Sequence, residues 1–207
     1  MTRFAILFSG RGSNMAALLE AAAQPGFPAQ PVLALCNVAD APGIALARAH
    51  GVETRCIPHR GLTRPAHEAA LQRELDAHLV ELICLAGYMR LLTPDFAARW
   101  AGRMLNIHPS LLPAFPGLDP HGQALAGGVK LHGCTVHLVT EATDSGPILA
   151  QAAVPVLPDD DPATLAARVL RQEHRLYPLA LRAFLEHDAI PADAGAALLN
   201  PLPLPGA

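Results

Sequence analysis

In residues 3–14, RFAILFSGRGSN, a short apolar run leads into a loop that contains two glycines. The run over 3–9 is apolar without alternation, which is typical of a strand covered on both faces of a sheet. Residues 14–23, NMAALLEAAA, then have a helical pattern that ends at Pro25 and Gly26. This order predicts a strand, a tight loop and a helix, the first unit of a parallel α/β sheet.

The same alternation of short apolar runs and helical patterns continues along the first half of the chain. Residues 31–37, 52–58 and 82–87 predict three more strands, and residues 42–50 and 64–79 predict the helices between them. Strands that alternate with helices form a parallel sheet with right-handed crossovers. The N-terminal half is therefore expected to be Rossmann-like.

The second half departs from this rhythm. The expected elements are a short helix from Thr93 and Pro94, a strand at 103–107, a proline-rich loop to about residue 121, strands at 133–139 and 147–156, and a long helix from Asp161 and Pro162. The last two strands are separated by the seven residues TEATDSG, which predicts an antiparallel hairpin. The predicted fold class is α/β, with a mostly parallel twisted sheet of about seven strands and helices on both faces.

The composition favours a globular protein without a nucleic-acid or membrane partner. Of 207 residues, 51% are hydrophobic and 16% charged, so the chain can bury a sizeable core. The net charge of −3 leaves no basic footprint for nucleic acid. An apolar strand directly after the first residues and the absence of an 18-residue apolar stretch predict a cytoplasmic protein. The four cysteines form no C-x-x-C pair, so we expect reduced thiols rather than a zinc knuckle.

The loop SGRGSN, residues 9–14, indicates an anion site. Its glycines allow a tight turn, and the free N–H groups at the helix start, with Ser13 and Asn14 beside them, suit an anion. A dinucleotide fingerprint would need glycine at Met15 and an acid near Asn37. A phosphate monoester is therefore the better interpretation, and the alternative is a glycine turn with an ordinary helix cap.

Asn106 and His108 lie two residues apart at the end of a predicted strand, so they share one face. Pro109 favours an extended conformation for His108. Ligands collect at the carboxyl edge of a parallel sheet, where an amide and an imidazole together can hold a carbonyl oxygen and the charge it develops. The alternative is a histidine that only packs or caps the strand.

The imidazole needs a carboxylate partner, and both Asp119 and Asp144 are candidates that spacing alone does not separate. A metal site is a second alternative, because five possible ligands lie within 37 residues: His108, His121, His132, His137 and Asp144. None of them has a recognised metal-ligand spacing, so no metal is expected. His137 is expected to support the site or to be a core histidine.

Glu173 stands out in the last predicted helix. It falls in the middle of an apolar arc, with arginines on the opposite side; the arc comprises Leu165, Val169, Leu176, Tyr177, Ala180 and Phe184. A carboxylate aimed into an apolar face needs a donor, a cation or a ligand amine. The alternative is a glutamate that reaches the edge of the core.

Five segments together resemble the phosphoribosylglycinamide formyltransferase family, the folate-dependent enzymes of purine synthesis. They are FSGRGSN, LAGYMRLLTP, NIHPSLLPAFPG, HGCTVHLVTEATDSGPILAQ and RVLRQEHRLYP, and the match runs in register from about residue 3 to residue 186. The resemblance implies transfer of a formyl group from 10-formyltetrahydrofolate, the co-substrate, to the amine of phosphoribosylglycinamide (GAR). It implies no metal, and a monomer or homodimer.

The resemblance also assigns roles to individual residues. Asn106 would hold the formyl oxygen, His108 would stabilise the oxyanion and donate a proton, and Asp144 would be its partner. The ribonucleotide would be held by Gly12, Ser13, Asn14 and Glu173. The folate pocket would be lined by Arg64, Met89, Arg90, Leu91, Leu92 and Asn106. We expect one formyltransferase domain over 1–188, with a phosphate-binding half at 1–100 and a catalytic half at 101–188, followed by an irregular tail at 189–207.

The chain departs from the family pattern in PGLDPHGQAL, residues 116–125, where Asp119 replaces a histidine and Gly122 a charged residue. Asp119 is thus a possible competitor of Asp144 for a histidine proton. Two alternatives to the transferase are 10-formyltetrahydrofolate hydrolase, whose relatives have an added N-terminal domain, and a non-catalytic nucleotide-binding module. Methionyl-tRNA formyltransferase would need an added C-terminal domain and a basic surface.

Overall fold

The structure is a computed structural model that describes residues 1–187, so the predicted tail at 189–207 lies outside the described residues. The elements in chain order are β1 (Thr2–Phe8), α1 (Ser13–Ala22), β2 (Ala29–Cys36), α2 (Gly43–Ala49), β3 (Thr54–Cys56), α3 (Arg64–Ala77), β4 (Leu82–Leu85), α4 (Pro94–Arg99), β5 (Met104–His108), α5 (Pro120–Ala126), β6 (Leu131–Leu138), β7 (Ile148–Pro155) and α6 (Pro162–His187). No helix in this part of the chain is both long and apolar enough to cross a membrane.

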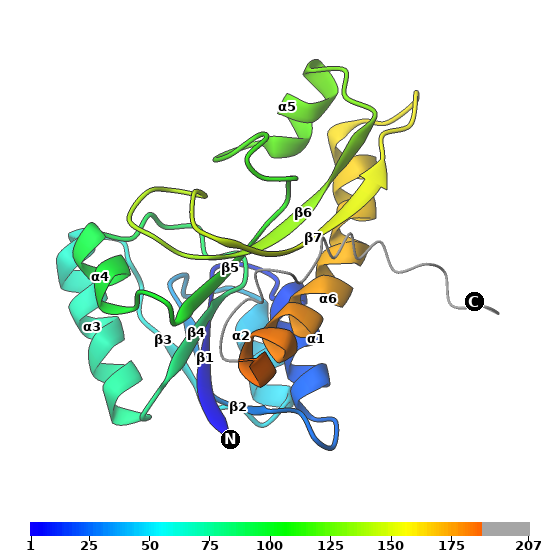
Figure 1. The fold of residues 1–207 in the computed structure, drawn as a ribbon. Coiled ribbons are helices and arrows are strands. Elements are labelled where there is room, and N and C mark those ends of the chain that lie inside the picture. Colours follow the sequence, from blue (N-terminus) through cyan, green and yellow to red (C-terminus); the bar gives the residue numbers. More distant parts are fainter. Residues whose placement is uncertain (188–207) are drawn as a thin grey trace.

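The strands form one seven-stranded sheet in the order β3-β2-β1-β4-β5-β6-β7 (Figure 1). Neighbours from β3 to β5 are parallel, whereas β5 with β6 and β6 with β7 are antiparallel. The predicted α/β class, the mostly parallel sheet and the antiparallel end are confirmed. The antiparallel part includes the β5–β6 pair as well as the expected hairpin.

Both faces of the sheet are covered, which explains the unbroken apolar run at the start of the chain. Phe4, Ile6 and Phe8 of β1 join the core on the side of α1, α2 and α6. Ala5 and Leu7 join the core on the side of α3 and α4. Figure 1 shows these two helix layers on opposite sides of the sheet. Successive β1 side chains point to opposite faces, so both sets must be apolar.

Several helices begin where the sequence indicates a cap. The Thr93 hydroxyl accepts a hydrogen bond from the Phe96 N–H at 3.2 Å, with Pro94 in the first turn of α4. The Asp161 carboxylate accepts one from the Thr164 N–H at 2.7 Å where α6 begins. Each cap satisfies an N–H that the helix itself leaves free. The predicted starts of these helices are confirmed.

The expected proline-rich loop contains a helix that the sequence did not reveal. Asp119 caps α5 through the Gly122 N–H, and Pro120 occupies the first turn. Glycine has low helix propensity, and Gly122 inside the helix hid the pattern. Strand β3 is shorter than the predicted range of 52–58. The connection between β6 and β7 covers 139–147, longer than the predicted turn.

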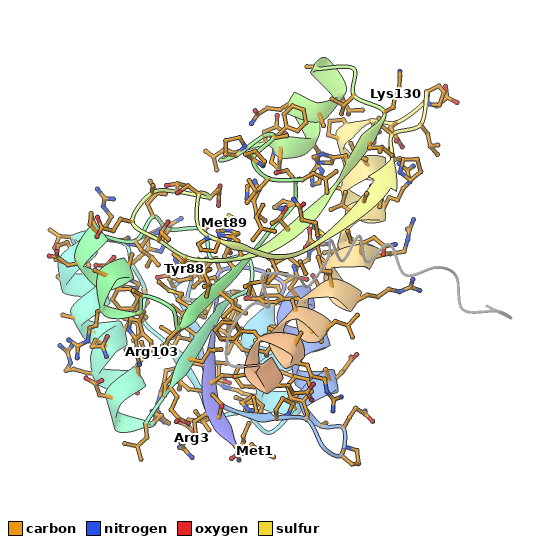
Figure 2. All side chains as sticks on the ribbon, viewed as in Figure 1. Met1, Arg3, Tyr88, Met89, Arg103 and Lys130 are labelled. Carbon is orange, nitrogen blue, oxygen red and sulfur yellow. The ribbon has the colours of Figure 1, made fainter. Side chains whose placement is uncertain are left out.

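The loops after β1, β4 and β5 meet at the carboxyl edge of the sheet. Strand β1 lies between β2 and β4, so the connection after β1 leads to one side of this strand and the connection after β3 leads to its other side. Such a switch point is where α/β sheets open a crevice. The Ser9 N–H donates to the Gly87 carbonyl at 3.1 Å, and the Met89 N–H donates to the Ser9 hydroxyl at 2.7 Å. Figure 2 shows Tyr88 and Met89 at this edge, and Met1 and Arg3 at the opposite end.

Candidate active site

The catalytic candidates come together across the antiparallel β5–β6 pair. Asn106 and His108 lie on β5, opposite His137 and Thr135 of β6. Asp144, from the β6–β7 connection, places its Oδ2 atom 3.4 Å from the His108 Nδ1 atom, and both side chains are about one-tenth exposed. The structure therefore brings together all three residues of the predicted triad.

Asp144 is held in an ionised state by several neighbours. Burial raises the pKa of its carboxyl, but contact with His137, the Gly117 N–H donated at 2.9 Å and the charges of His108 and His137 lower it, so the pKa lies below its ordinary value. The backbone of Asp144 is left-handed, with a φ of 51°. An ionised carboxylate beside the His108 Nδ1 atom orients the imidazole ring.

Asp119 is not the partner of His108. Its side chain accepts the Gly122 N–H at 3.2 Å and caps α5 instead. The two carboxylates that the spacing left open thus have separate positions, with Asp144 beside the imidazole and Asp119 at a helix start. In this geometry Asp119 does not compete with Asp144 for a proton of His108.

His137 orients the amide of Asn106. The Nδ1 atom of His137 lies 2.9 Å from the Leu138 carbonyl, to which only an N–H can donate. Its Nε2 atom lies 3.1 Å from the Asn106 Nδ2 atom and 3.6 Å from the Asp144 Oδ1 atom. The contact with His137 therefore fixes the orientation of the Asn106 amide. His137 thus supports the site, one of the two interpretations that the sequence left open.

Buried polar contacts hold the loop after β5. The Thr135 hydroxyl donates to the Ser110 carbonyl at 2.7 Å and accepts from the Leu112 N–H at 3.0 Å. The Gln151 amide donates to the Leu112 carbonyl at 2.8 Å. The same loop brings the Phe115 carbonyl to 3.1 Å from the His108 Nε2 atom. Both ring nitrogens of His108 therefore have an acceptor, which fixes the plane of the ring.

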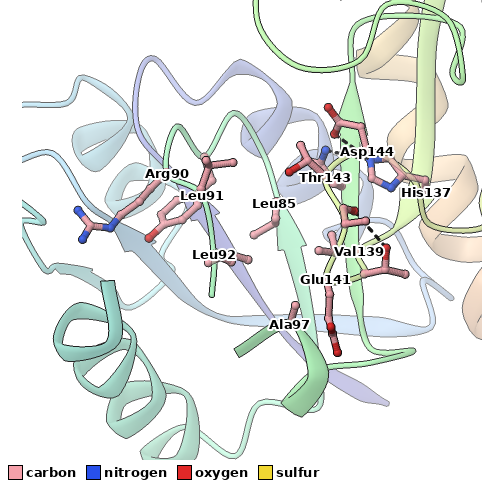
Figure 3. Close-up of a pocket in the computed structure, with 14 residues that line it drawn as sticks. Leu85, Arg90, Leu91, Leu92, Ala97, His137, Val139, Glu141, Thr143 and Asp144 are labelled. Atoms are coloured by element: carbon pink, nitrogen blue, oxygen red, sulfur yellow. Dashed lines mark hydrogen bonds and ion pairs between the residues drawn. The ribbon is translucent and has the colours of Figure 1, made fainter. Parts of the chain in front are cut away.

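A cavity of about 140 Å³ opens beside these residues (Figure 3). Its walls come from the end of β4 and its following loop, from β5 and β6, and from the β6–β7 connection; they include Leu85, Arg90, Leu91, Leu92, Asn106, His137, Val139 and the segment 140–144. Four of the residues predicted for the folate pocket therefore line it, namely Arg90, Leu91, Leu92 and Asn106.

The other two residues predicted for the folate pocket lie outside the lining of this cavity. Met89 is 72% exposed, and Arg64 is an exposed residue in the first turn of α3. The Arg90 guanidinium donates to the carbonyls of His59 at 3.2 Å and Leu62 at 3.1 Å, and it points away from Asp144 in Figure 3. Arg90 thus contributes its stem to the wall while its charge faces the β3–α3 loop.

The N-terminus of α1 forms the second polar region of the carboxyl edge. The Asn14 Nδ2 atom donates to the Glu173 carboxylate at 2.5 Å, and Glu173 is only 7% exposed. Burial raises the pKa of Glu173, and the hydrogen bond from Asn14 opposes that shift. Among the described residues, the buried Asn14 Oδ1 atom has no hydrogen-bond partner. Helix α6 thus delivers Glu173 to the loop at 9–14, and its buried position is the one that its place in the apolar arc predicted.

Gly12 is required by the close approach of two segments. Its φ is 78°, and a Cβ atom there would lie 2.7 Å from the Met15 Cε atom and 3.2 Å from the Gly43 Cα atom. No side chain caps α1 among the described residues, so its first N–H groups remain available. The loop therefore presents donors and a positive dipole end to an anion.

His121 and His132, the other two histidines considered as metal ligands, form a separate pair. The His132 Nε2 atom lies 3.2 Å from the His121 Nδ1 atom. Burial, with a smaller contribution from His121, lowers the pKa of His132 to about 4, so that ring is neutral at pH 7. Within residues 1–187, no group of three His, Cys, Asp or Glu side chains could hold a metal ion.

Sequence reasoning missed the residues that support the site from β6 and β7. Thr135, fully buried, and Gln151 tie the loop after β5 to the sheet. The alternation of the strand at 133–139 already places Thr135 and His137 on one face, which was the available signal. The Phe115 carbonyl had no such signal, because it depends on the path of the loop.

Comparison with known proteins identifies relatives along nearly the whole described chain. The formyl transferase family matches residues 2–181. The Escherichia coli phosphoribosylglycinamide formyltransferase is 41% identical over 182 residues, which cover 87% of this chain and 86% of that protein. The human trifunctional purine biosynthetic protein adenosine-3 is 44% identical over 181 residues, but the match spans only 18% of that longer protein.

Solved structures of similar proteins have the same fold. A phosphoribosylglycinamide formyltransferase from Brucella melitensis is 57% identical, with a TM-score of 0.85 over 89% of this chain and 95% of that one. A glycinamide ribonucleotide transformylase from Symbiobacterium toebii is 46% identical, with a TM-score of 0.87 over 90% of this chain and 88% of that one.

Proposed function

This chain belongs to the formyl transferase family, and we propose that it transfers the formyl group of 10-formyltetrahydrofolate to the amine of GAR, giving formyl-GAR and tetrahydrofolate. The observation that carries the proposal is the meeting of two polar regions at one edge of the sheet. One contains the α1 N-terminus with Glu173, and the other contains Asn106, His108 and Asp144.

The first region suits a phosphorylated amine. Gly12, Ser13 and Asn14 supply the loop and helix start for the phosphate, because free N–H groups and the helix dipole favour an anion. Glu173, beside Asn14, supplies a buried acceptor for an amine or amide of the same substrate. The loop after β4 joins this region to the cavity through the Met89–Ser9 and Ser9–Gly87 hydrogen bonds.

The cavity suits the flat ring system of a folate. Leu85, Leu92 and Val139 supply apolar walls, and the segment 140–144 lines the cavity along with them. Arg90, Leu91 and Asn106 complete the folate contacts that we propose within the cavity. Arg64 and Met89 remain proposals for the exposed end of the ligand, because both lie outside the cavity lining and face solvent.

In the proposed reaction, the GAR amine attacks the formyl carbon and the formyl oxygen becomes an oxyanion. Asn106 is placed to donate an amide hydrogen to that oxygen, and His137 holds the amide in the required orientation. A new C–N bond forms to the amine, and the bond from the formyl carbon to N10 of the folate breaks. One proton leaves the amine and one reaches N10, so the atoms and charges balance.

His108 is the proposed proton donor and a second group that stabilises the oxyanion. The ionised Asp144 beside its Nδ1 atom orients the ring and compensates positive charge on it, and the ring supplies the proton that the leaving nitrogen needs. Its Nε2 atom faces the Phe115 carbonyl at 3.1 Å, so the N–H must leave that carbonyl for the substrate when it donates. The chemistry proposed here uses the side chains and the two substrates, without a metal.

The proposal includes the setting of the enzyme. Its partners would be GAR and 10-formyltetrahydrofolate rather than nucleic acid or a membrane, and it would work in the cytoplasm as a monomer or homodimer. One formyltransferase domain over 1–188, with a phosphate-binding half at 1–100 and a catalytic half at 101–188, remains our proposed division.

The test is the absorbance change on deformylation of 10-formyltetrahydrofolate, measured with and without GAR, together with mass spectrometry of formyl-GAR. We expect turnover that depends on GAR and yields one formyl-GAR for each folate consumed. Turnover at the same rate without GAR would identify a hydrolase. Saturable GAR binding with no turnover would identify a nucleotide-binding module. Either result would overturn the proposal.

A further inference from the structure

The start of α5 lies next to the catalytic pair, and its cap is formed by a residue that departs from the family pattern. We propose that Asp119 is a positioning residue, whose cap on α5 holds residues 115–117 against His108 and Asp144. The inference rests on the proposed function, because it assigns Asp119 a part in that reaction. Asp119 does not contact the catalytic side chains; it acts through the backbone of the loop.

The cap ties the residues on both sides of Asp119. Its side chain accepts the Gly122 N–H at 3.2 Å, and its own carbonyl accepts the Gln123 N–H at 3.0 Å. The Gln123 amide then donates back to the Leu118 carbonyl at 2.7 Å. The first turn of α5 and the segment before it therefore form one hydrogen-bonded unit.

That segment contacts both members of the catalytic pair. The Phe115 carbonyl lies 3.1 Å from the His108 Nε2 atom. Two residues later, the Gly117 N–H donates to the Asp144 carboxylate at 2.9 Å. Residues 115–117 thus supply an acceptor to the imidazole and a donor to its carboxylate. The Phe115 ring packs against the core and lies edge-on to His132. Pro116, Gly117 and Leu118 are exposed, so little packing holds the Gly117 end of the segment apart from the cap.

Gly122 and Asp119 depend on one another. A Cβ atom at residue 122 would lie 2.2 Å from the Asp119 Oδ2 atom and 2.8 Å from its Cγ atom. A larger residue at 122 is therefore incompatible with this position of the Asp119 side chain. The Asp119 backbone is also left-handed, with a φ of 52°, a conformation that Asp and Asn tolerate better than most residues. Asp119 and Gly122, the two positions that depart from the family pattern, therefore form one structural unit.

The geometry indicates that Asp119 acts by capping α5 and not through its charge. The side chain is exposed and bonds to a backbone N–H, whereas Asp144 already occupies the position beside His108. Asn also accepts an N–H bond at a helix start and also tolerates a left-handed backbone. Asp119→Asn should therefore preserve the cap, and Asp119→Ala should remove it.

The experiment compares steady-state kinetics of Asp119→Ala, Asp119→Asn and wild type. Asp119→Ala should lower kcat about tenfold and leave both KM values within about twofold, because it misplaces the catalytic pair without touching the substrate pockets. Asp119→Asn should stay within about twofold of wild-type kcat. A matched control is Asp161→Ala, which removes the cap of α6, a helix that carries neither member of the pair, and should leave kcat unchanged.

A double-mutant cycle tests the pairing with Gly122. Gly122→Ala should lower kcat in the wild-type background, because the new Cβ displaces the Asp119 side chain. In the Asp119→Ala background the same change should cost nothing further. Additive losses from the two substitutions would contradict a shared unit.

The ring signals of His108 in ¹⁵N-labelled protein give a readout that does not depend on turnover. They should move in Asp119→Ala and stay in place in Asp119→Asn and Asp161→Ala, even if wild type failed to transfer a formyl group. Absence of wild-type turnover with these shifts would reject the proposed function and keep the structural role. An unchanged kcat in Asp119→Ala, or an equal loss in Asp119→Asn, would overturn the inference.

Discussion

The two polar regions of the carboxyl edge are built in different ways. The anion region comes mainly from one continuous segment, residues 9–14, where the loop runs directly from β1 into α1. The catalytic region combines β5, β6, the β6–β7 connection and the loop before α5, with Asn106, His108, His137, Asp144 and Phe115 as its members. The first depends on local backbone shape, and the second on how distant segments meet.

The difference predicts how each region fails. A local loop presents backbone N–H groups, so a substitution there should weaken binding of the phosphorylated substrate and spare the chemical step. The catalytic region depends on side-chain atoms held at hydrogen-bond distances, so a substitution there should lower kcat.

The largest effect is expected for the His108–Asp144 pair. Asp144→Asn removes the carboxylate charge beside the imidazole and should lower kcat about 10²- to 10⁴-fold, as should His108→Ala. Steady-state assays with both substrates saturating measure this loss. Asp119→Asn, which changes a carboxylate outside the pair, is the matched control and should stay close to wild type. Wild-type rates in Asp144→Asn, with a loss in Asp119→Asn, would reverse the assignment.

Gly12→Ala should impair the anion region and leave the catalytic region intact. The new Cβ would meet the Met15 side chain and the Gly43 backbone, and the left-handed φ adds strain. We expect the KM for GAR to rise about 10- to 100-fold with kcat changed by less than about threefold. Gly26→Ala is the control, because Gly26 also has a positive φ but has no described atom within 4 Å of its Cβ position. A fall in kcat with an unchanged KM would show that the two regions are not separable.

Thr135→Val should remove hydrogen bonds that hold the loop after β5 next to the catalytic region. The fully buried hydroxyl donates to the Ser110 carbonyl and accepts from the Leu112 N–H, so its loss leaves buried backbone groups unpaired. Urea denaturation should show a free energy of unfolding about 1–3 kcal/mol lower, and kcat should fall severalfold. Thr54→Val on β3, which removes one buried hydrogen bond to the Val52 carbonyl, should lower stability without changing kcat. A stable, fully active Thr135→Val variant would show that this network does not position the loop.

The same contrast explains how much the sequence could predict. The strands, the helices other than α5 and the inward position of Glu173 followed from local periodicity, and the structure has them. The choice between Asp119 and Asp144 did not follow, because it depends on the β5–β6 register and on the path of the loop after β6. Helix α5 was missed because its cap depends on a left-handed Asp119 and its pattern contains Gly122. Local pattern predicts elements, whereas long-range pairing decides which side chains meet.

The smallest expected effect is a pH dependence that comes from Glu173 of the anion region. Burial raises the pKa of this carboxyl and the Asn14 hydrogen bond only partly opposes it, so the folded protein holds the proton more tightly than the unfolded chain. Its contribution to stability is therefore fully present below the unfolded pKa and is lost as the pH rises through the folded pKa.

Glu173→Gln, which cannot ionise, should remove this dependence. Urea denaturation between about pH 4 and pH 8 should show wild type losing stability relative to Glu173→Gln as the pH rises. Glu20→Gln, which removes an exposed carboxylate on α1, controls for the change in net charge and should run parallel to wild type. If wild type instead gained stability relative to Glu173→Gln with rising pH, the carboxylate would be stabilised in its charged form. The Asn14 hydrogen bond would then outweigh burial, and the direction of the Glu173 pKa shift would be reversed.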